Sequence, residues 1–314
     1  NYGFLAPMTN RDNVINMNHM NSHEAVQTTV VPNANPSMLL DKLPCLPALL
    51  GKLAFKSSTY QITDSLPALR AEQNNFLIVS RHLDKFRTIC GFKQGNRIPP
   101  TYLQTLAMPL VLNIMSDSQF PIRAIGKMHL RNKVSVLESF DPRQPINLVV
   151  SICNSLLSSR GLEWNMDFNA TVDNQLVWSG TSSYLYECET GMGRREIPKL
   201  IRGDNPQDWL VPNGTGRRYG RISGDCNPIH LSTITAKMFG FKSAIAHGMW
   251  SKSRCIAALE DQLPESNYSV DVSFHRPLYL PSNVKFYTRQ LETGQHFSLF
   301  NSRGEKSYLT GLIS

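Results

Sequence analysis

The chain has 314 residues, which is enough for one large domain or two of ordinary size. Hydrophobic residues make up 41% of it and charged residues 18%, so a wholly disordered chain and a long charged coiled coil are both excluded. The formal net charge of +8 favours an anionic partner, but no run of like charges selects one class of partner over another.

Residues 1–53 form an extension with little periodicity, polar and Asn-rich at its start, and we expect it to be partly disordered. No apolar run in the chain approaches the roughly 20 residues of a membrane span, and no secretory signal is recognisable. The six cysteines are scattered without a C-x-x-C pair, which favours reduced thiols. These features predict a cytoplasmic protein without a membrane span.

The segments that follow are duplicated along the chain. Phe76-Leu77-Ile78 resembles Trp209-Leu210-Val211, and residues 86–91 resemble residues 219–224, in both cases 133 positions further on. One offset shared by two separate patches indicates an internal repeat rather than chance.

Each copy contains one helix-like run followed by four segments with strand-like patterns. The helix-like runs are residues 100–115 and 247–263. The strand-like segments are residues 124–140, 146–156, 161–172 and 175–186 in the first copy, and 269–280, 283–290, 296–301 and 305–314 in the second. A strand, a central helix and a run of antiparallel strands predict an α+β fold, with a curved sheet wrapped around a helix.

A polar stretch rich in glycine, proline and arginine separates the two copies and is the best linker candidate. We therefore assign residues 54–190 to a degenerate first copy, residues 191–208 to the linker and residues 209–314 to the second copy.

The second copy carries an insertion of about fourteen residues between its first strand and its central helix. Asp225, Asn227 and His230 lie there within six positions, after a predicted strand, and Asn-Pro favours a turn that brings the carboxylate and the imidazole together. Both groups can hold the same water molecule, as general acid–base chemistry requires. An Asx-turn or a helix cap is the plainer alternative. It does not explain why the first copy has Phe92 in place of Asp225 and no counterpart of His230.

His247 and Gly248 fall at the predicted start of the second central helix. The first N–H groups of a helix lack internal partners, and glycine has no side chain to obstruct a ligand carbonyl, so the Gly248 N–H is an oxyanion-donor candidate. For His247, a capping or packed histidine is the alternative. Asp225, His230 and His247 do not have the spacing of a familiar metal motif, and we expect no metal.

These residues resemble the motif of the MaoC-like dehydratase family, also called (R)-specific enoyl-CoA hydratases or hydratase 2. The matching positions are Tyr219, Ser223, Gly224, Asp225, Asn227, Pro228, Ile229, His230 and Ala236, followed by Gly240-Phe241 and Ile245-Ala246-His247-Gly248-Met249. The resemblance covers residues 209–314 and extends more loosely to the first copy.

The resemblance implies a double hotdog fold and the reversible hydration of a trans-2-enoyl thioester to a (3R)-3-hydroxyacyl thioester. It implies Asp225 and His230 as the catalytic pair, Asn227 as a residue that orients the water or His230, and the Gly248 N–H as the oxyanion donor. We expect Ser223, His247 and Met249 of the motifs to contact the substrate. The repeat alignment adds Phe92 and Tyr102 to these.

The implied partner is an acyl-CoA or acyl-ACP substrate, which itself carries the coenzyme A or phosphopantetheine, so no separate cofactor is expected. A hotdog thioesterase and a non-catalytic acyl-thioester-binding protein are the alternatives. A nucleic-acid partner is not expected, because no basic stripe is interleaved with aromatic residues. A homodimer is possible as well as a monomer.

Overall fold

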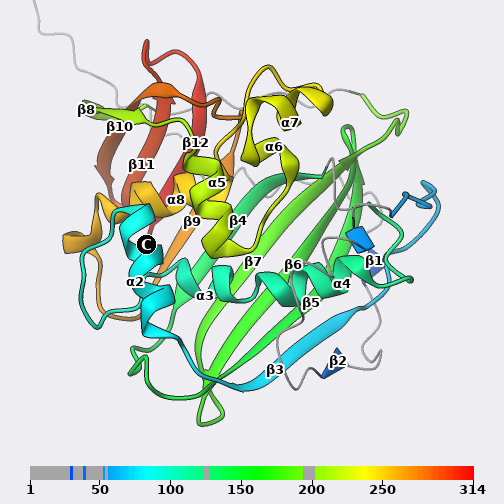
Figure 1. Cartoon of the computed structure of the whole chain (residues 1–314), viewed down its shortest axis with the longest axis horizontal. Coiled ribbons are helices and arrows are strands. Elements are labelled where there is room, and N and C mark those ends of the chain that lie inside the picture. Colours follow the sequence, from blue (N-terminus) through cyan, green and yellow to red (C-terminus); the bar gives the residue numbers. More distant parts are fainter. Residues whose placement is uncertain (1–28, 31–37, 40–51, 54–55, 124–126, 194–201) are drawn as a thin grey trace, which may run out of the picture.

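The structure is a computed structural model that describes residues 29–30, 38–39, 52–53, 56–123, 127–193 and 202–314. In this part of the chain, 12 strands form one sheet, and helices pack along it (Figure 1). None of the helices in these residues is long and apolar enough to cross a bilayer.

The two halves of the sheet have the same strand order. In the first half β3 (Arg70–Phe76), β5 (Ile146–Ser158), β6 (Gly161–Val172), β7 (Gln175–Glu187) and β4 (Met128–Val136) lie side by side. In the second half the order is β8 (Asp204–Val211), β10 (Ser282–Leu291), β11 (Gly294–Asn301), β12 (Ser307–Ile313) and β9 (Tyr268–Phe274). Antiparallel pairing of β4 with β9 joins the halves, so the predicted α+β double hotdog is confirmed.

The strands follow from the alternation of apolar residues along the sequence. In β5, Ile146, Leu148, Val150 and Ile152 are buried, and the residues between them are more exposed. This period of two places one face of the strand against the helices.

The central helices are α3 (Tyr102–Leu106) with α4 (Met108–Ser116) in the first half and α8 (Gly248–Ala257) in the second, with the short turn η2 (Glu260–Gln262) after α8. The first helix, expected as one run, is divided at Ala107. Pro109 explains the break, because proline has no N–H to donate and can stand only in the first turn of a helix.

The repeat also includes a helix that the sequence analysis did not predict. Helices α2 (Ser80–Cys90) and α5 (Thr215–Ser223) each end at a left-handed glycine, Gly91 with φ 85° and Gly224 with φ 77°. These glycines lie 133 positions apart, as the repeat predicts. The expectation that Asp225 follows a strand was therefore wrong: it follows helix α5.

Buried polar contacts tie the halves together. Lys252 of α8 donates from Nζ to the Asn132 carbonyl oxygen (2.9 Å) and Oδ1 (2.6 Å) and to the Val270 carbonyl oxygen (2.9 Å), on the two strands that join the halves. His82 Nε2 donates to the Ile222 carbonyl oxygen (2.8 Å) and Trp250 Nε1 to that of Ile89 (2.9 Å). Ile89 of α2 and Ile222 of α5 are equivalent positions of the repeat, and each accepts a hydrogen bond from a ring N–H of the other half.

Two predicted segments lie partly outside the described residues. Within the predicted extension, β1 (Thr29–Val30) pairs with β5 and β2 (Met38–Leu39) pairs with β3, and most of residues 1–53 are not described. Within the predicted linker, β8 already begins at Asp204, and residues 194–201 are not described.

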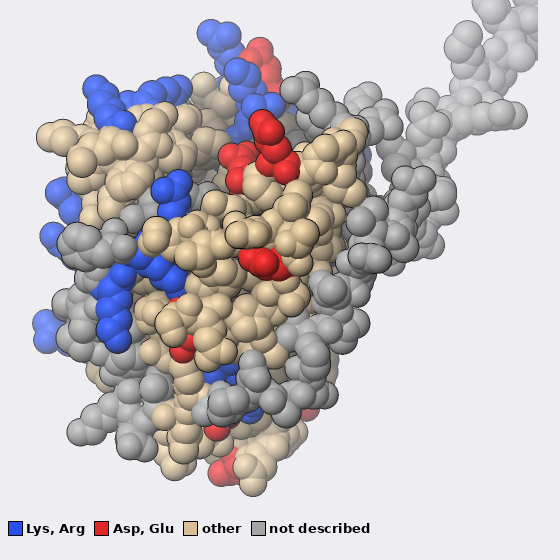
Figure 2. Space-filling view, turned by 90° about the vertical axis from the view of Figure 1, so that its right-hand side faces the viewer, with Lys and Arg blue, Asp and Glu red and all other residues tan. Residues whose placement is uncertain are grey.

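Charge on the face drawn in Figure 2 is gathered in separate groups. Most lysines and arginines lie toward its left edge and top, with a few in the lower centre, acidic residues lie at the top, in the centre and along the lower edge, and much of the surface between them is uncharged. The coloured lysines and arginines therefore form no single continuous patch on this face.

Candidate active site

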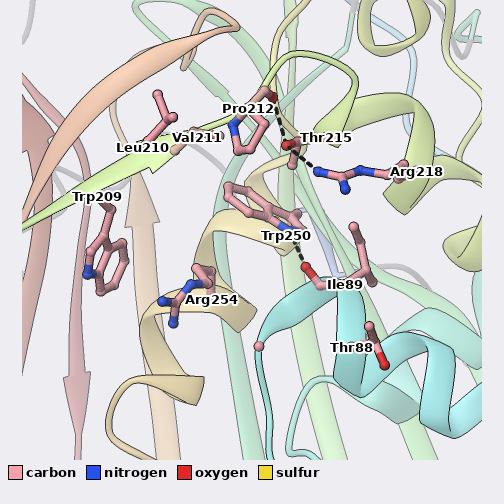
Figure 3. Close-up of a pocket in the computed structure, with 11 residues that line it drawn as sticks. Thr88, Ile89, Trp209, Leu210, Val211, Pro212, Thr215, Arg218, Trp250 and Arg254 are labelled. Atoms are coloured by element: carbon pink, nitrogen blue, oxygen red, sulfur yellow. Dashed lines mark hydrogen bonds between the residues drawn. The ribbon is translucent and has the colours of Figure 1, made fainter.

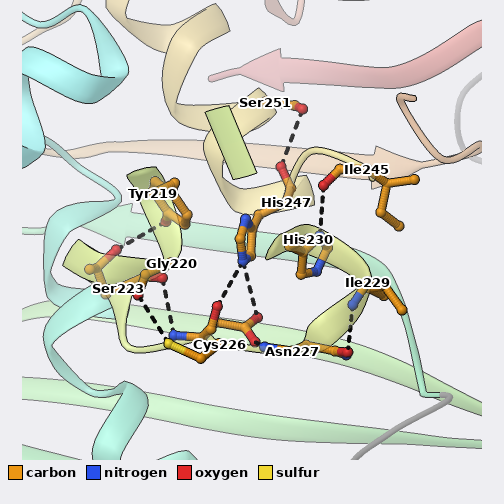
Figure 4. Close-up of polar contacts among 12 residues, drawn as sticks. Tyr219, Gly220, Ser223, Cys226, Asn227, Ile229, His230, Ile245, His247 and Ser251 are labelled. Carbon is orange, nitrogen blue, oxygen red and sulfur yellow. Dashed lines mark hydrogen bonds and ion pairs between the residues drawn. The ribbon is translucent and has the colours of Figure 1, made fainter. Parts of the chain in front are cut away.

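The insertion of the second half folds into the loop after α5, the short helix α6 (Pro228–Leu231) and α7 (Thr233–Met238). Figure 4 shows polar contacts of residues from the loop and from α6. Gly224 ends α5 in the left-handed conformation, and the Ser223 hydroxyl accepts a hydrogen bond from the Asp225 N–H at 3.2 Å. Asn227 then caps α6, because its Oδ1 accepts from the Ile229 N–H at 3.4 Å. The Asn-Pro pair thus starts the helix that carries His230.

Two glycines of α5 let the insertion approach the helix closely. A Cβ on Gly216 would lie 2.3 Å from the His230 carbonyl oxygen, and one on Gly220 would lie 2.8 Å from the Asp225 carbonyl oxygen. Any side chain at either position would push the backbone of a candidate catalytic residue away from its place.

His230 is held as a neutral imidazole with one free lone pair. Its Nδ1 lies 2.9 Å from the Ile245 carbonyl oxygen, which can only accept, so Nδ1 carries the proton and Nε2 the lone pair. Burial, together with the charge that His247 can carry, lowers the pKa of His230 to about 3. The ring is therefore uncharged near neutral pH and can accept a proton.

His247 contacts both members of the expected pair. Its Nε2 donates to the Asp225 carbonyl oxygen at 3.0 Å and lies 4.0 Å from Asp225 Oδ2. Its ring stacks on that of His230, with centroids 3.7 Å apart and planes at 26°. His247 occupies the N-cap position of α8 without forming a side-chain cap, and burial lowers its pKa.

Asp225 remains ionised although it is partly buried, with 30% of its side chain exposed. Burial opposes its ionisation, but the positive charge that His247, His230 and Lys127 can carry outweighs this effect, and the Asn227 N–H adds a hydrogen bond. Together they lower the pKa of the Asp225 carboxyl to about 2.

Gly248 presents an unused donor at the start of α8. None of the described residues accepts a hydrogen bond from its N–H, which belongs to the first turn of the helix. A Cβ at this position would lie 3.0 Å from Cε1 of the Phe274 ring, so the helix start fits tightly against β9. Met249, the next residue, is buried.

The two site residues expected in the first half lie in an aromatic cluster. Phe92 and Tyr102 pack on Phe86, with ring centroids 6.2 Å and 5.2 Å apart, and Phe86 contacts Tyr219, which in turn contacts His247. Both side chains are buried, and the rings of Phe86 and Tyr219 lie between them and His247. Contact of Phe92 and Tyr102 with the substrate stays a prediction.

Asp225, His230 and His247 also meet as a possible ligand set, with one donor atom from each within 4.8 Å of the others. Zinc bonds of about 2.0–2.2 Å to nitrogen and oxygen would require these atoms to approach more closely. His247 Nε2 already donates to a backbone carbonyl, and a donating N–H is not a ligand. The donor set therefore fits a water better than a metal, and the expected absence of a metal stays a prediction.

The sequence analysis missed the residues that reach the site from distant strands. Lys127 directly precedes β4, and its positive charge helps to lower the pKa of Asp225. Its Nζ lies 5.7 Å from the centre of the Tyr184 ring. Phe274 of β9 sets the space in front of Gly248. Neither belongs to the local motif, and only the pairing of β4 with β9 brings them together, so no nearby sequence signal marks them.

The fold and the site define a double hotdog protein whose polar constellation sits at the start of one central helix. Comparison with known proteins agrees: residues 207–310 match the family described as MaoC like domain. A curated relative, 3-hydroxyacyl-thioester dehydratase X of Mycobacterium tuberculosis, is 28% identical over 256 residues, covering 80% of this chain and 91% of the relative.

Solved structures share the double hotdog fold. The crystal structure of HtdX from Mycobacterium tuberculosis superposes with a TM-score of 0.68 at 25% identity, covering 78% of this chain and 98% of that one. A MaoC-like dehydratase from Phytophthora capsici superposes with a TM-score of 0.66 at 18% identity, covering 81% and 98%. The second half of the chain therefore matches the MaoC-like domain, and 80% of the chain is similar to a protein named as a 3-hydroxyacyl-thioester dehydratase.

Proposed function

We propose that this enzyme catalyses the reversible syn hydration of a trans-2-enoyl thioester to the (3R)-3-hydroxyacyl thioester. The name of the Mycobacterium tuberculosis relative, a 3-hydroxyacyl-thioester dehydratase, supports the substrate class. One observation carries the assignment of the chemistry. Asp225 and His230 both contact His247, the residue that directly precedes the Gly248 N–H at the start of α8.

In the proposed reaction, one water is held by Asp225 and by the Nε2 lone pair of His230. Its oxygen forms a bond to C3 of the substrate while one O–H bond breaks and the proton passes to the pair. The π electrons of the C2–C3 bond move toward the thioester, and the pair returns one proton to C2 on the same face. Atoms and charge balance, and the pair is regenerated.

The Gly248 N–H would receive the thioester oxygen, on which negative charge builds during the attack. A preorganised donor at a helix N-terminus stabilises such charge, and the helix dipole adds to it. Burial of His230 and His247 keeps bulk water away from these groups and strengthens the interaction. Asn227 would act by holding the helix that carries His230.

The thioester carrier is coenzyme A or the phosphopantetheine of an acyl carrier protein, and it arrives with the substrate. Both carriers are anionic, which suits a net charge of +8. Neither a metal nor a redox group is required, because the N–H polarises the thioester and the pair manages the proton.

The test is incubation of the purified chain with crotonyl-CoA and longer enoyl-CoAs in D2O, with loss of the enoyl absorbance followed over time. Syn addition predicts a single diastereomer labelled with deuterium at C2, with (3R) configuration at C3, by NMR of the product. The (3S) product or a mixture at C2 would contradict the proposal. Release of free thiol without hydration, measured by a thiol-trapping reagent, would favour the thioesterase alternative.

A further inference from the structure

Phe274, the last residue of β9, stands directly against the start of α8. A Cβ placed on Gly248 would lie 3.0 Å from Cε1, 3.1 Å from Cδ1 and 3.2 Å from Cζ of the Phe274 ring. Three consecutive atoms of one ring edge therefore border the backbone of the candidate oxyanion donor. A group bound at the Gly248 N–H must fit beside this edge, because carbon atoms in contact stay about 3.5–4.0 Å apart.

Phe274 is held in place by a ring row, which consists of His129, Tyr184 and Trp164. These three residues lie directly opposite one another on β4, β7 and β6. The ring centroids of Phe274 and His129 are 4.9 Å apart. The centroids are 4.8 Å apart between His129 and Tyr184, and 5.5 Å apart between Tyr184 and Trp164. Tyr184 and Trp164 are buried, so a shift of Phe274 toward the row would have to disturb a closely packed core.

An irregularity in β4 turns His129 into this row. His129 and Asn132 are three positions apart, so a regular strand would point them to opposite faces. Their partners on β7, Tyr184 and Ser182, are two positions apart and share one face. The register shift between His129 and Arg131 accounts for the difference, because a β-bulge adds a residue to one strand and re-aims its side chains. Since α8 donates to Asn132, this face is the one toward the central helices.

The pocket drawn in Figure 3 does not enlarge the space beside the ring edge. It lies between α2, β8, α5 and α8 and has a volume of about 200 Å³. Neither Gly248 nor Phe274 is among its lining residues, so it is separate from the start of α8 that faces β9. A bulky group at the Gly248 N–H therefore gains no room from this pocket.

We propose that Phe274, held by the ring row, makes the site selective for enoyl thioesters that carry no branch at C2. This selectivity rests on the proposed function, which puts the thioester oxygen at the Gly248 N–H. Because C2 is bonded to the thioester carbon, a substituent on C2 lies close to the Phe274 ring edge. A hydrogen atom fits there and a methyl group does not. The substrate class is therefore the acyl chain that is unbranched at C2.

The test compares hydration of crotonyl-CoA with hydration of its 2-methyl analogue, tiglyl-CoA, by loss of the enoyl absorbance. The readout is the kcat/KM for tiglyl-CoA divided by that for crotonyl-CoA, and the change in this ratio between variants does not depend on the lower intrinsic reactivity of the branched compound. Phe274→Ala makes room for the methyl group and should raise the ratio about 10-fold or more. Phe274→Leu, a smaller change, should raise it less. Phe239→Ala is the matched control, because Phe239 is 39% exposed, and it should leave the ratio unchanged.

Equal kcat/KM for the two substrates in the unaltered chain would overturn the selectivity. So would a ratio that stays unchanged in Phe274→Ala or, if that variant does not fold, in Phe274→Leu. These outcomes leave hydration of crotonyl-CoA intact, so they are distinguishable from failure of the proposed reaction. If crotonyl-CoA itself is not hydrated, the proposed function fails and the selectivity falls with it.

Discussion

The two halves of the molecule share a strand order but differ at the start of the central helix. In the first half the Tyr102 N–H already donates to the Pro99 carbonyl oxygen at 2.9 Å. In the second half the corresponding end, at Gly248, has a free N–H as far as the described residues show. The same scaffold thus has a satisfied helix end in one copy and an open donor in the other.

The second difference is the insertion. After α2, Gly91 is followed by Phe92, which is 5% exposed and packs in the core. After α5, Gly224 is followed by Asp225, with 30% of its side chain exposed, and then by the two helices α6 and α7. The duplication explains the shared strands and helices, and the candidate site comes from the insertion that only the second half carries.

The largest expected effect comes from removing the polar groups that distinguish the second half. Asp225→Asn and His230→Ala should each lower turnover by roughly 10²–10⁴, because each removes one partner of the water. Steady-state rates on crotonyl-CoA measure this. Asp173→Asn, an exposed turn residue with φ 49°, is the control and should keep the wild-type rate. Wild-type rates in either site variant would remove that residue from the mechanism.

A smaller loss is expected from closing the free helix end. Gly248→Ala places a methyl group 3.0 Å from Phe274 Cε1, so the helix start must shift, and kcat should fall about 10- to 100-fold. The double variant Gly248→Ala/Phe274→Leu should recover part of the rate by relieving the contact. Gly95→Ala, which meets open space, is the control. Full activity in Gly248→Ala alone would show that the N–H position is not critical.

The buried histidines of the second half predict how stability depends on pH. Burial lowers the pKa of His230 and His247 in the folded state, so below the unfolded value of about 6.5 the unfolded chain binds more protons. The free energy of unfolding should therefore fall as pH drops below 6.5, by up to about 1.4 kcal/mol per pH unit for each ring, and stay constant with respect to these groups above it.

Urea unfolding between pH 4 and pH 8 measures this slope. His230→Ala should make the fall in the free energy of unfolding less steep, by up to about 1.4 kcal/mol per pH unit, because one buried ring is removed. An equally steep slope in that variant would mean that His230 is protonated in the folded state, contrary to the lowered pKa.

The smallest effect is expected from metal removal. Since the proposed reaction uses only side chains and a backbone N–H, dialysis against a chelator should leave kcat unchanged. Loss of activity that zinc restores would instead assign Asp225, His230 and His247 to a metal site.

The strands and the repeat were predictable because they depend on local pattern. Alternating burial places β6 at Gly161–Val172, the predicted bounds, since one face of each strand packs inward. The offset of 133 positions locates both left-handed glycines. The motif likewise identified Asp225, Asn227 and His230 as neighbours, because they are close in sequence and share one short insertion.

Helix α5 was not predictable in the same way. Gly216 and Gly220 are poor helix formers, which hides the helix from propensity arguments. These positions require glycine because backbone oxygens approach them closely. A Cβ on Gly216 would lie 2.3 Å from the His230 carbonyl oxygen, and one on Gly220 would lie 2.8 Å from the Asp225 carbonyl oxygen. Such contacts form only in the folded chain. The contribution of Lys127 is hidden for the same reason.

A crystal structure of Asp225→Asn with a bound enoyl-CoA would test the central claim most directly. We predict the thioester oxygen about 2.7–3.1 Å from the Gly248 nitrogen, with C3 facing the space between residue 225 and His230. A thioester bound at the start of α3 in the first half, or one turned away from His230, would contradict it.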